Sequence, residues 1–442
     1  MSSSPIIPRL LRLAWPTALA RLGIMGMSVV DVMVVGQFAS AELPYQALGW
    51  APIAVLMVTS IGLLTGVQVL GARAIGAGTP SEAGGALRRG LVVSTVAGLL
   101  SVAAIWLLGE HLFTAFGISE ELAGPSTQVA RILAFSVPLH LFYVTTAFFL
   151  EAIQRPLAST VAMWVANALN LALNLWLVPK LGAVGSAWCT VGARFGLATL
   201  LLVWVFRLPD AEVLGVRRPA LSPGYSALLR VGLAACVSHA AESGAFSGMT
   251  ILAGRLGPDA VSAYQILLNL MAILFMAALG ISSATAVLTS EAVGSGDAAR
   301  ANRSSFSGIG LVLLLMLTAA LALVGFSGPI GHAYTANATL AAMVSGLLWL
   351  VALILPWDGG QAVAAAALRA HGQNWFPTAS HLLAYAVVMP SVAYFLGEVR
   401  GQGVAGLMSA ILWASVLSFS VLCFRLWRLR RQVPQPDRRS TE

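Results

Sequence analysis

Charged residues are scarce in this chain of 442 residues, because Asp, Glu, Lys and Arg make up only 10% of it. The single lysine, Lys180, lies in the sequence Val-Pro-Lys-Leu. A Walker A loop needs Gly-Lys followed by Ser or Thr, so ATP hydrolysis by such a loop is excluded. The HExxH and nucleophile-elbow patterns are absent as well. Any transport by this chain is therefore expected to be driven by an ion gradient.

Cysteine is also rare. Cys189, Cys236 and Cys423 each stand alone in an apolar stretch, without CxxC spacing. This arrangement argues against a disulfide framework and against a zinc site. We interpret the three residues as small buried hydrophobic side chains.

Apolar residues, by contrast, make up 58% of the chain and form runs of about 20 residues or more, the length that spans a bilayer. The sequence predicts an all-α polytopic membrane protein with 12 transmembrane helices. The expected spans are residues 13–38, 48–72, 90–108, 129–150, 158–178, 185–206, 228–253, 263–289, 306–326, 341–368, 376–395 and 404–426.

Basic residues are distributed unevenly between the two sides of these spans. On the side of both termini lie 19 of the 25, whereas only Lys180, Arg255 and Arg400 lie on the opposite side. The positive-inside rule predicts that both termini are cytoplasmic. The ratio of 24 Arg to one Lys is typical of a GC-rich bacterial genome. We therefore expect a bacterial inner membrane protein. Topology and the anionic inner leaflet explain the net charge of +8, so no nucleic-acid partner is inferred, and a monomer is expected.

The chain contains an internal repeat with an offset of 218 residues. This offset aligns Leu-Leu-Arg at residues 10–12 with the same triplet at 228–230, and it aligns glycines and a proline at 36 and 254, 62 and 280, and 138 and 356. Six spans in each half predict two lobes related by a pseudo-two-fold axis along the membrane normal. The expected divisions are residues 1–206, a linker at 207–226, a second lobe at 227–426 and a basic tail at 427–442.

Only three of the 17 acidic residues, Asp31, Glu242 and Asp358, fall well inside spans. A carboxylate at bilayer depth costs about 2.5 to 3.5 kcal/mol on insertion scales, so each is a candidate for coupling to a cation or proton. None has an acidic counterpart in the repeat. Pro16 and Pro356, in the spans of Asp31 and Asp358, each remove a backbone donor and are expected to act as helix hinges.

Neutral polar residues recur at helical spacing in two other spans. Asn167, Asn170 and Asn174 share one face of the fifth span, and Gln265 and Asn269 share one face of the eighth. Interhelical hydrogen bonding and a polar lining for a cation or substrate both remain open explanations. Gln361 follows Asp358 within one turn and joins this candidate lining.

The chain resembles multidrug and toxic compound extrusion (MATE) transporters of the NorM-like branch over nearly its full length. The resemblance depends on Pro16 with Val30-Asp31, on Glu242, on Ala263-Tyr264-Gln265 with Asn269, on the segment from Asp358 to Arg369, and on Asn170 with Asn174. It implies a V-shaped, two-lobed carrier that exports bulky, often cationic drugs in exchange for Na⁺ or H⁺. It also implies an N-lobe acid at Asp31 and a C-lobe cation site, Na⁺ included, at Glu242 and Asp358. Ile354 stands where some relatives have a tyrosine, which leaves the choice of coupling ion open.

Two other functions compete with drug export. A lipid-linked oligosaccharide flippase of the same superfamily would need a basic cavity and would depend on Arg21 and Arg194. An intramembrane lipid-modifying enzyme would need a cluster of nucleophile, base or metal ligands, which the sequence does not contain. The sequence therefore favours a transporter that is not an enzyme and that uses no cofactor beyond its coupling ion.

Overall fold

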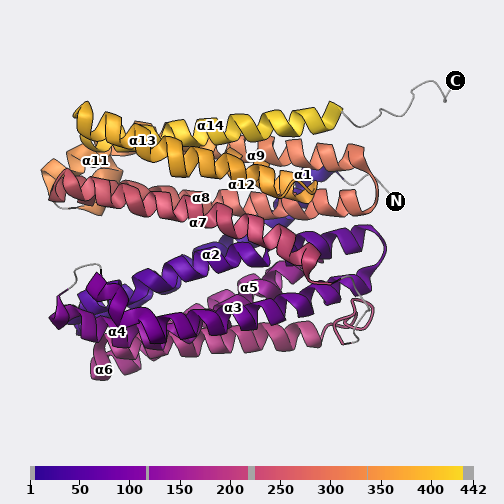
Figure 1. The fold of residues 1–442 in the computed structure, drawn as a ribbon, viewed down its shortest axis with the longest axis horizontal. Coiled ribbons are helices and arrows are strands. Elements are labelled where there is room, and N and C mark those ends of the chain that lie inside the picture. Colours follow the sequence, from indigo (N-terminus) through magenta and orange to yellow (C-terminus); the bar gives the residue numbers. More distant parts are fainter. Residues whose placement is uncertain (1–4, 116–118, 218–223, 336, 432–442) are drawn as a thin grey trace. The chain divides into compact units, whose positions relative to one another are not determined.

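The computed structural model describes residues 5–115, 119–217, 224–335 and 337–431, and within them the chain is helical (Figure 1). The elements are α1 (Ile6–Phe38), η1 (Ser40–Glu42), α2 (Leu43–Gly76), α3 (Pro80–Ala115), α4 (Glu120–Ala134), α5 (Ser136–Ala152), α6 (Leu157–Phe206), α7 (Ser226–Arg255), α8 (Pro258–Gly294), α9 (Ala298–Gly325), α10 (Ser327–Tyr334), α11 (Ala338–Ala370), α12 (Trp375–His381), η2 (Leu382–Val388), α13 (Met389–Ala393), η3 (Tyr394–Val399) and α14 (Gly403–Arg431). Residues 218–223 of the predicted linker and 432–442 of the predicted tail lie outside the described residues.

Ten helices in the described part of the chain are long and apolar enough to cross a bilayer. One of them, α6, is 50 residues long and contains two spans that meet at Gly182. The remaining span is α7, whose polar residues, among them Ser238, Glu242 and Ser243, lower its mean hydropathy. Together these helices account for the 12 predicted spans and confirm the all-α membrane fold.

The helices form two compact units. The first unit is Trp15–Ser243, and the second is Met1–Ala14 with Gly244–Glu442. The division therefore falls next to Pro16 in α1 and next to Glu242 in α7, whereas the sequence placed it in the 207–226 linker. An ion pair explains why the start of α1 belongs to the second unit, since Arg9 lies 2.8 Å from Glu291 of α8. The predicted domain boundaries stay a prediction.

Each unit is built around central helices. In the first unit, α2 contacts α3, α4, α5 and α6, and α5 contacts α2, α3 and α6. In the second unit, α11 contacts α8, α9 and α14 along its length. Asp358 is therefore placed on a helix that three long helices of its unit surround. Close packing requires small residues here, because a Cβ on Gly359 or Gly360 would collide with Met316 or with the Phe419 ring.

The two repeat-matched prolines have different structural effects. Pro138 lies in the first turn of α5, just after the break between α4 and α5 at Phe135, where its missing N–H leaves no bond unmade. Pro356 lies inside α11, which continues unbroken from Ala338 to Ala370. The two halves therefore differ in helix geometry at the same repeat position.

The chain between α12 and α13 forms a π-helical segment, η2, which precedes Pro390. Proline has no N–H and its ring clashes with the carbonyl four residues earlier, so the regular α-helical bonds cannot continue through this point. Such π segments occur often at functional sites. Tyr385, a fully buried residue, lies in the middle of η2.

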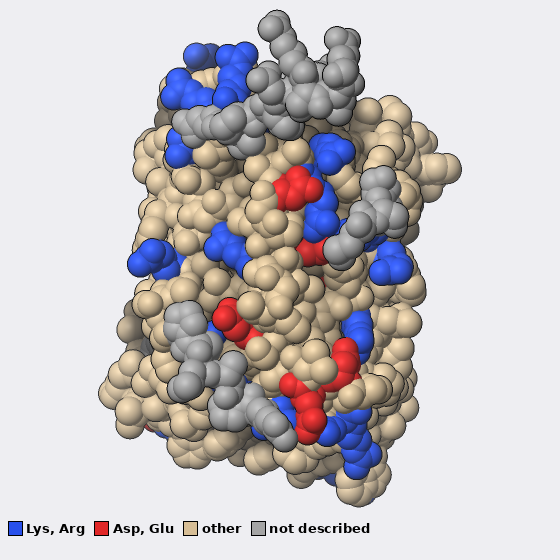
Figure 2. Space-filling view, turned by 90° about the vertical axis from the view of Figure 1, so that its right-hand side faces the viewer, with Lys and Arg blue, Asp and Glu red and all other residues tan. Residues whose placement is uncertain are grey.

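Charged residues lie at the end of the second unit where α1 begins and α14 ends. Figure 2 shows this face, and basic side chains cover more of it than acidic side chains do. The last turn of α14 contributes Arg428, Arg430 and Arg431. This distribution agrees with the charge asymmetry of the sequence, and the orientation in the membrane stays a prediction.

The turn between the two spans of α6 depends on one glycine. Gly182 has φ 56° and ψ −137°, and the Glu42 carboxylate next to it accepts a hydrogen bond from the Ala183 N–H at 2.7 Å. A Cβ at position 182 would collide with that carboxylate. The backbone conformation and the close approach both require glycine here.

We expect Gly182→Ala to lower the apparent melting temperature of the detergent-purified protein, because it combines a left-handed backbone with a steric clash. The destabilisation should be about 1 to 3 kcal/mol. Gly192→Ala is the matched control, since its added methyl group would meet only Leu173 at ordinary contact distance. Equal melting temperatures for the two variants would contradict this account of the turn.

Candidate functional site

Asp31 of α1 is buried in the first unit and is surrounded by neutral hydrogen-bond donors. Its Oδ1 accepts from Asn170 Nδ2 at 3.0 Å and from Asn174 Nδ2 at 2.8 Å, and its Oδ2 accepts from Thr190 Oγ1 at 2.6 Å. Asp31 is only 6% exposed. Hydrogen bonds to a charged group contribute about 1.5 to 3 kcal/mol each, so three of them offset the burial of the charge. The structure thus brings together three residues that the sequence singled out, and it adds Thr190.

Polar contacts join α1 to the first half of α6 at regular intervals. Thr160 Oγ1 donates to the Pro16 carbonyl at 2.7 Å, and Asn167 Nδ2 donates to the Gly23 carbonyl at 3.0 Å. The bonded residues are separated by 144 positions in both pairs, and Asn174 bonds Asp31 at a separation of 143. The two helices therefore run in parallel, in register, with contacts every two turns. The amide face predicted from spacing is the face that binds α1.

The two asparagines keep an unused acceptor each. Among the described residues, Asn170 Oδ1 and Asn174 Oδ1 are buried and have no hydrogen-bond partner. Both amides donate an N–H to the Asp31 carboxylate. Asn174 Nδ2 also donates to the Asn170 carbonyl at 2.9 Å. A buried acceptor without a donor is unfavourable, so these oxygens are suited to receive a proton donor when the charge on Asp31 changes.

Asp358 is the corresponding buried acid of the second unit, also 6% exposed. Its Oδ1 accepts from Tyr385 Oη at 3.4 Å and from Ser415 Oγ at 3.3 Å, and it is hydrogen bonded to the side chain of Gln361. These donors come from η2, α14 and α11. Gln361 Oε1 is buried and has no partner among the described residues. Carboxylate, hydroxyl and amide oxygens are the ligands that a hard cation prefers, so the residues present fit Na⁺ as well as a proton.

Sequence reasoning missed Tyr385 and Ser415, and it noted only that Ile354 stands where some relatives have a tyrosine. Ile354, one turn before Asp358, is fully buried, and the hydroxyl comes instead from Tyr385 in η2. The ring of Tyr385 is held by Phe246 and His381, at centroid distances of 6.2 and 5.7 Å. The proline after η2 was the available signal, because a proline within an apolar run interrupts regular helix geometry.

Glu242 is half-buried in α7 and belongs to the first unit, whereas Asp358 and its hydrogen-bond partners belong to the second. In the described part of the chain, no three His, Cys, Asp or Glu side chains lie close enough together to hold a metal ion. The predicted Na⁺ site of Glu242 with Asp358 therefore stays a prediction. The oxygens that surround Asp358 come from Tyr385, Ser415 and Gln361.

Gln265 and Asn269 share one exposed face of α8, as their spacing predicts, and they bond to residues other than Asp358. Gln265 Nε2 donates to Thr250 Oγ1 at 3.2 Å, and Asn269 Oδ1 accepts from Tyr334 Oη at 3.4 Å. With Tyr334 they line an open pocket of the second unit. They are available to a ligand, whereas Asp358 is enclosed.

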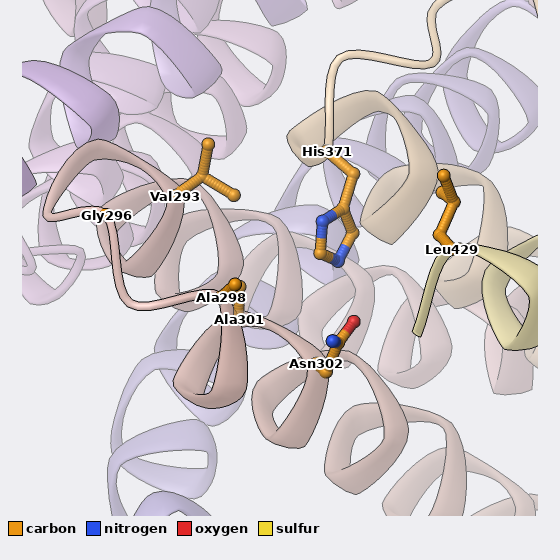
Figure 3. A pocket seen from close by; sticks show the side chains of 7 residues that line it. All are labelled: Val293, Gly296, Ala298, Ala301, Asn302, His371 and Leu429. Carbon is orange, nitrogen blue, oxygen red and sulfur yellow. The ribbon is translucent and has the colours of Figure 1, made fainter. Parts of the chain in front are cut away.

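A second pocket, of about 300 Å³, lies at the helix ends of the second unit. In Figure 3 Asn302 of α9 and His371, the residue after α11, point into it, and Leu429 of α14 lies at its side. Ser305 Oγ and His371 Nε2 are 3.2 Å apart nearby. None of the predicted site residues lines this pocket.

These features define a class of protein. A helical membrane protein that buries a carboxylate in each of two compact units has the features of a membrane transporter. The MatE family model matches residues 16–176 and 234–395. The matched segments start 218 residues apart (234 minus 16), which is the offset of the internal repeat. The chain belongs to this family, the multidrug and toxic compound extrusion (MATE) transporters.

Individual relatives align with this sequence over nearly its whole length. The chain is 40% identical to the probable multidrug resistance protein NorM of Caulobacter vibrioides, over 96% of this chain and 92% of the relative. It is 28% identical to the multidrug resistance protein PmpM of Pseudomonas aeruginosa, over 99% and 94%. The solved outward-facing conformation of a multidrug resistance MATE family transporter has the same fold, with a TM-score of 0.88 at 18% identity over 96% of both chains.

We expect Tyr385→Phe to shift the ion concentration at which transport is half-maximal by about three- to tenfold, because the Asp358 carboxylate loses a hydrogen-bond donor while the ring packing is kept. The measurement is dye efflux from membrane vesicles as a function of Na⁺ and of proton concentration. Tyr394→Phe is the control, since Tyr394 is 53% exposed. An unchanged ion response in Tyr385→Phe would exclude a role for this hydroxyl.

Proposed function

We propose that this MATE transporter is a secondary active exporter of bulky organic cations, coupled to the inward movement of protons or Na⁺ through alternating access. The observation that carries the proposal is the pair of buried carboxylates, Asp31 and Asp358, one in each unit, both bonded to neutral donors rather than to a salt-bridge partner. A carboxylate held in this way can gain and lose a cation reversibly. A closed salt bridge would resist that exchange.

Asp31 is proposed to bind a proton. When the acid is protonated, its O–H needs an acceptor, and an amide of Asn170 or Asn174 that rotates offers its unused Oδ1. Hydrogen bonds to a neutral acid are about half as strong as those to a carboxylate. Protonation would therefore loosen the contact of α1 with α6. Pro16, next to the unit boundary, is the proposed hinge at which α1 responds.

Asp358 is proposed to bind the coupling cation in the second unit, with Tyr385, Ser415 and Gln361 as its neighbours. The unpaired Gln361 Oε1 and the two hydroxyl oxygens support either Na⁺ or a proton. Neutralising Asp358 removes a buried negative charge, which lowers the cost of closing the protein around it. Glu242 and Pro356 are proposed to assist, Glu242 as a further cation ligand and Pro356 as a hinge in α11.

The energy available is sufficient. One unit charge that moves inward is worth about 2.3 kcal/mol per 100 mV. Since about 1.4 kcal/mol corresponds to a tenfold concentration ratio, one such charge sustains a roughly fiftyfold gradient of a neutral substrate. A cationic drug would need a correspondingly larger coupling.

The substrate class follows from the chemistry of the acids and from the relatives. Buried carboxylates favour cationic over anionic substrates. The names of the NorM and PmpM relatives describe multidrug resistance proteins, and we extend that role to this chain. Gln265 and Asn269 are proposed to contribute a polar lining for such compounds. We further propose a monomer in the bacterial inner membrane with both termini in the cytoplasm.

The flippase alternative is not favoured. It would need arginines open to a pyrophosphate group, but Arg194 is only 3% exposed and donates to Ser136 Oγ at 2.8 Å. Arg21 lies over the Phe148 ring at 5.4 Å. A buried or stacked guanidinium is poorly placed to bind a large anion.

The test is dye efflux from proteoliposomes with an imposed Na⁺ gradient or an imposed pH gradient, each applied separately. We expect Asp31→Asn and Asp358→Asn each to reduce coupled efflux by about tenfold or more, because neither variant can exchange a cation at the substituted position. Glu242→Gln is expected to weaken efflux as well.

Asp259→Asn is the control, because Asp259 is an exposed acid in the first turn of α8. Coupled efflux at the wild-type rate by both Asp31→Asn and Asp358→Asn would refute the proposed coupling. The gradient that supports efflux in the wild type identifies the ion.

A further inference from the structure

Arg194 is a charged residue that the proposed mechanism leaves unused. It lies in the second half of α6 and is 3% exposed, at a depth where apolar residues dominate. An arginine in a membrane span is costly and is usually paired. Among the ion pairs of the described residues, however, none includes Arg194. Its charge must therefore be stabilised in another way.

Its contacts are neutral. Arg194 Nη1 donates to Ser136 Oγ of α5 at 2.8 Å and to Met57 Sδ of α2 at 3.3 Å. The guanidinium lies over the Trp50 ring, 5.2 Å from its centroid. These contacts fix the position of the group, but they cannot neutralise a full positive charge in a medium of low dielectric constant.

The balancing charge is Asp31. Thr190, which donates to Asp31 Oδ2, lies one turn before Arg194 on the same face of α6. The hydrogen-bond partners of the Asp31 carboxylate and of the Arg194 guanidinium differ, so the two opposite charges lie near one another on this face of α6 without a direct bond. At a low effective dielectric constant their interaction stays considerable beyond hydrogen-bonding distance.

The other titratable groups around this pair are few. His140 of α5 is buried and lies near both Arg194 and Arg21 of α1. Cys189 of α6 lies near Asp31. The contacts from α2 are the neutral side chains of Met57 and Trp50. Among these groups, Arg194 is the cation that lies one helical turn from Thr190, a direct partner of Asp31.

The second unit has no equivalent among its described residues. Asp358 is bonded to two hydroxyls and an amide, and none of the ion pairs in the described part of the chain includes it. The repeat offset of 218 places Leu412, an uncharged residue of α14, at the position that corresponds to Arg194. The two buried acids therefore differ in electrostatic setting.

We propose that Arg194 is a permanent internal counter-cation of Asp31, a positioning residue that weakens the binding of a proton there. The inference builds on the proposed function, because it concerns how tightly the first unit holds its coupling ion. An incoming cation must compete with the guanidinium, so the ion is bound less firmly and is released more easily. Asp358, which has no such competitor, responds at lower cation concentrations.

The experiment compares Arg194→Gln with the wild type in proteoliposomes, with dye efflux measured against proton and Na⁺ concentration. We expect half-maximal occupancy at about tenfold lower concentration in Arg194→Gln, and a slower release that lowers turnover. Infrared difference spectroscopy of the carboxylic acid C=O band measures Asp31 protonation directly, without transport. The proton concentration at which this band is half-maximal should also be about tenfold lower in Arg194→Gln. The band that disappears in Asp31→Asn is the one that belongs to Asp31.

Three variants serve as controls. Arg21→Gln removes a nearby charge that acts on His140, and it should leave the Asp31 band unchanged. Ser136→Ala removes a hydrogen bond of Arg194 but keeps the charge, so it should have little effect. Arg194→Lys keeps the charge and should restore most of the wild-type response. In the Asp31→Asn background, Arg194→Gln should not shift the ion concentration at which the residual efflux is half-maximal.

An unchanged Asp31 band in Arg194→Gln would overturn the proposal, as would a shift that persists in the Asp31→Asn background. If Arg194→Gln does not fold alone, the double variant Asp31→Asn/Arg194→Gln decides. Removing both charges should restore stability relative to either single variant, whereas purely structural contacts of Arg194 would give additive losses. Coupled efflux at the wild-type rate by both Asp31→Asn and Asp358→Asn would refute the proposed function, while the infrared result would still test Arg194.

Discussion

The structure depends on how it keeps a carboxylate in an apolar interior. Each buried acid must be surrounded by donors, because an isolated charge in a medium of low dielectric constant is strongly unfavourable. Asp31 obtains its donors from two asparagines and a threonine on α6. Asp358 obtains them from hydroxyls on η2 and α14 and from an amide on α11 itself. The same constraint thus has two solutions in one chain.

Prolines and one π-helical segment occur in the elements that contain these acids or their hydrogen-bond donors. Pro16 precedes Asp31 in α1, and Pro356 precedes Asp358 in α11 by two residues. The π-helical segment η2 carries Tyr385 to the Asp358 carboxylate. Helix irregularities of this kind place a side chain where a regular helix would not, which explains why they coincide with the polar groups.

The internal repeat supplies a frame, and the acids break its symmetry. Glycines and prolines recur at the offset of 218, and the two segments that match the MatE family model start at the same offset. Even so, Pro138 follows a helix break whereas Pro356 lies within a continuous helix. Neither Asp31 nor Asp358 has an acidic partner in the repeat. The units therefore share their packing and differ in their chemistry.

The sequence by itself determined the membrane class, the 12 spans, the family and the acids Asp31 and Asp358, because hydropathy, helical spacing and the cost of buried charge are local properties of the chain. It also predicted the amide face of α6 from the spacing of its asparagines. Only the tertiary structure decided which groups meet those acids. Thr190, Tyr385 and Ser415 are far from their partners in sequence, and a hydroxyl in an apolar helix has no distinctive pattern until a neighbouring helix brings it to a carboxylate.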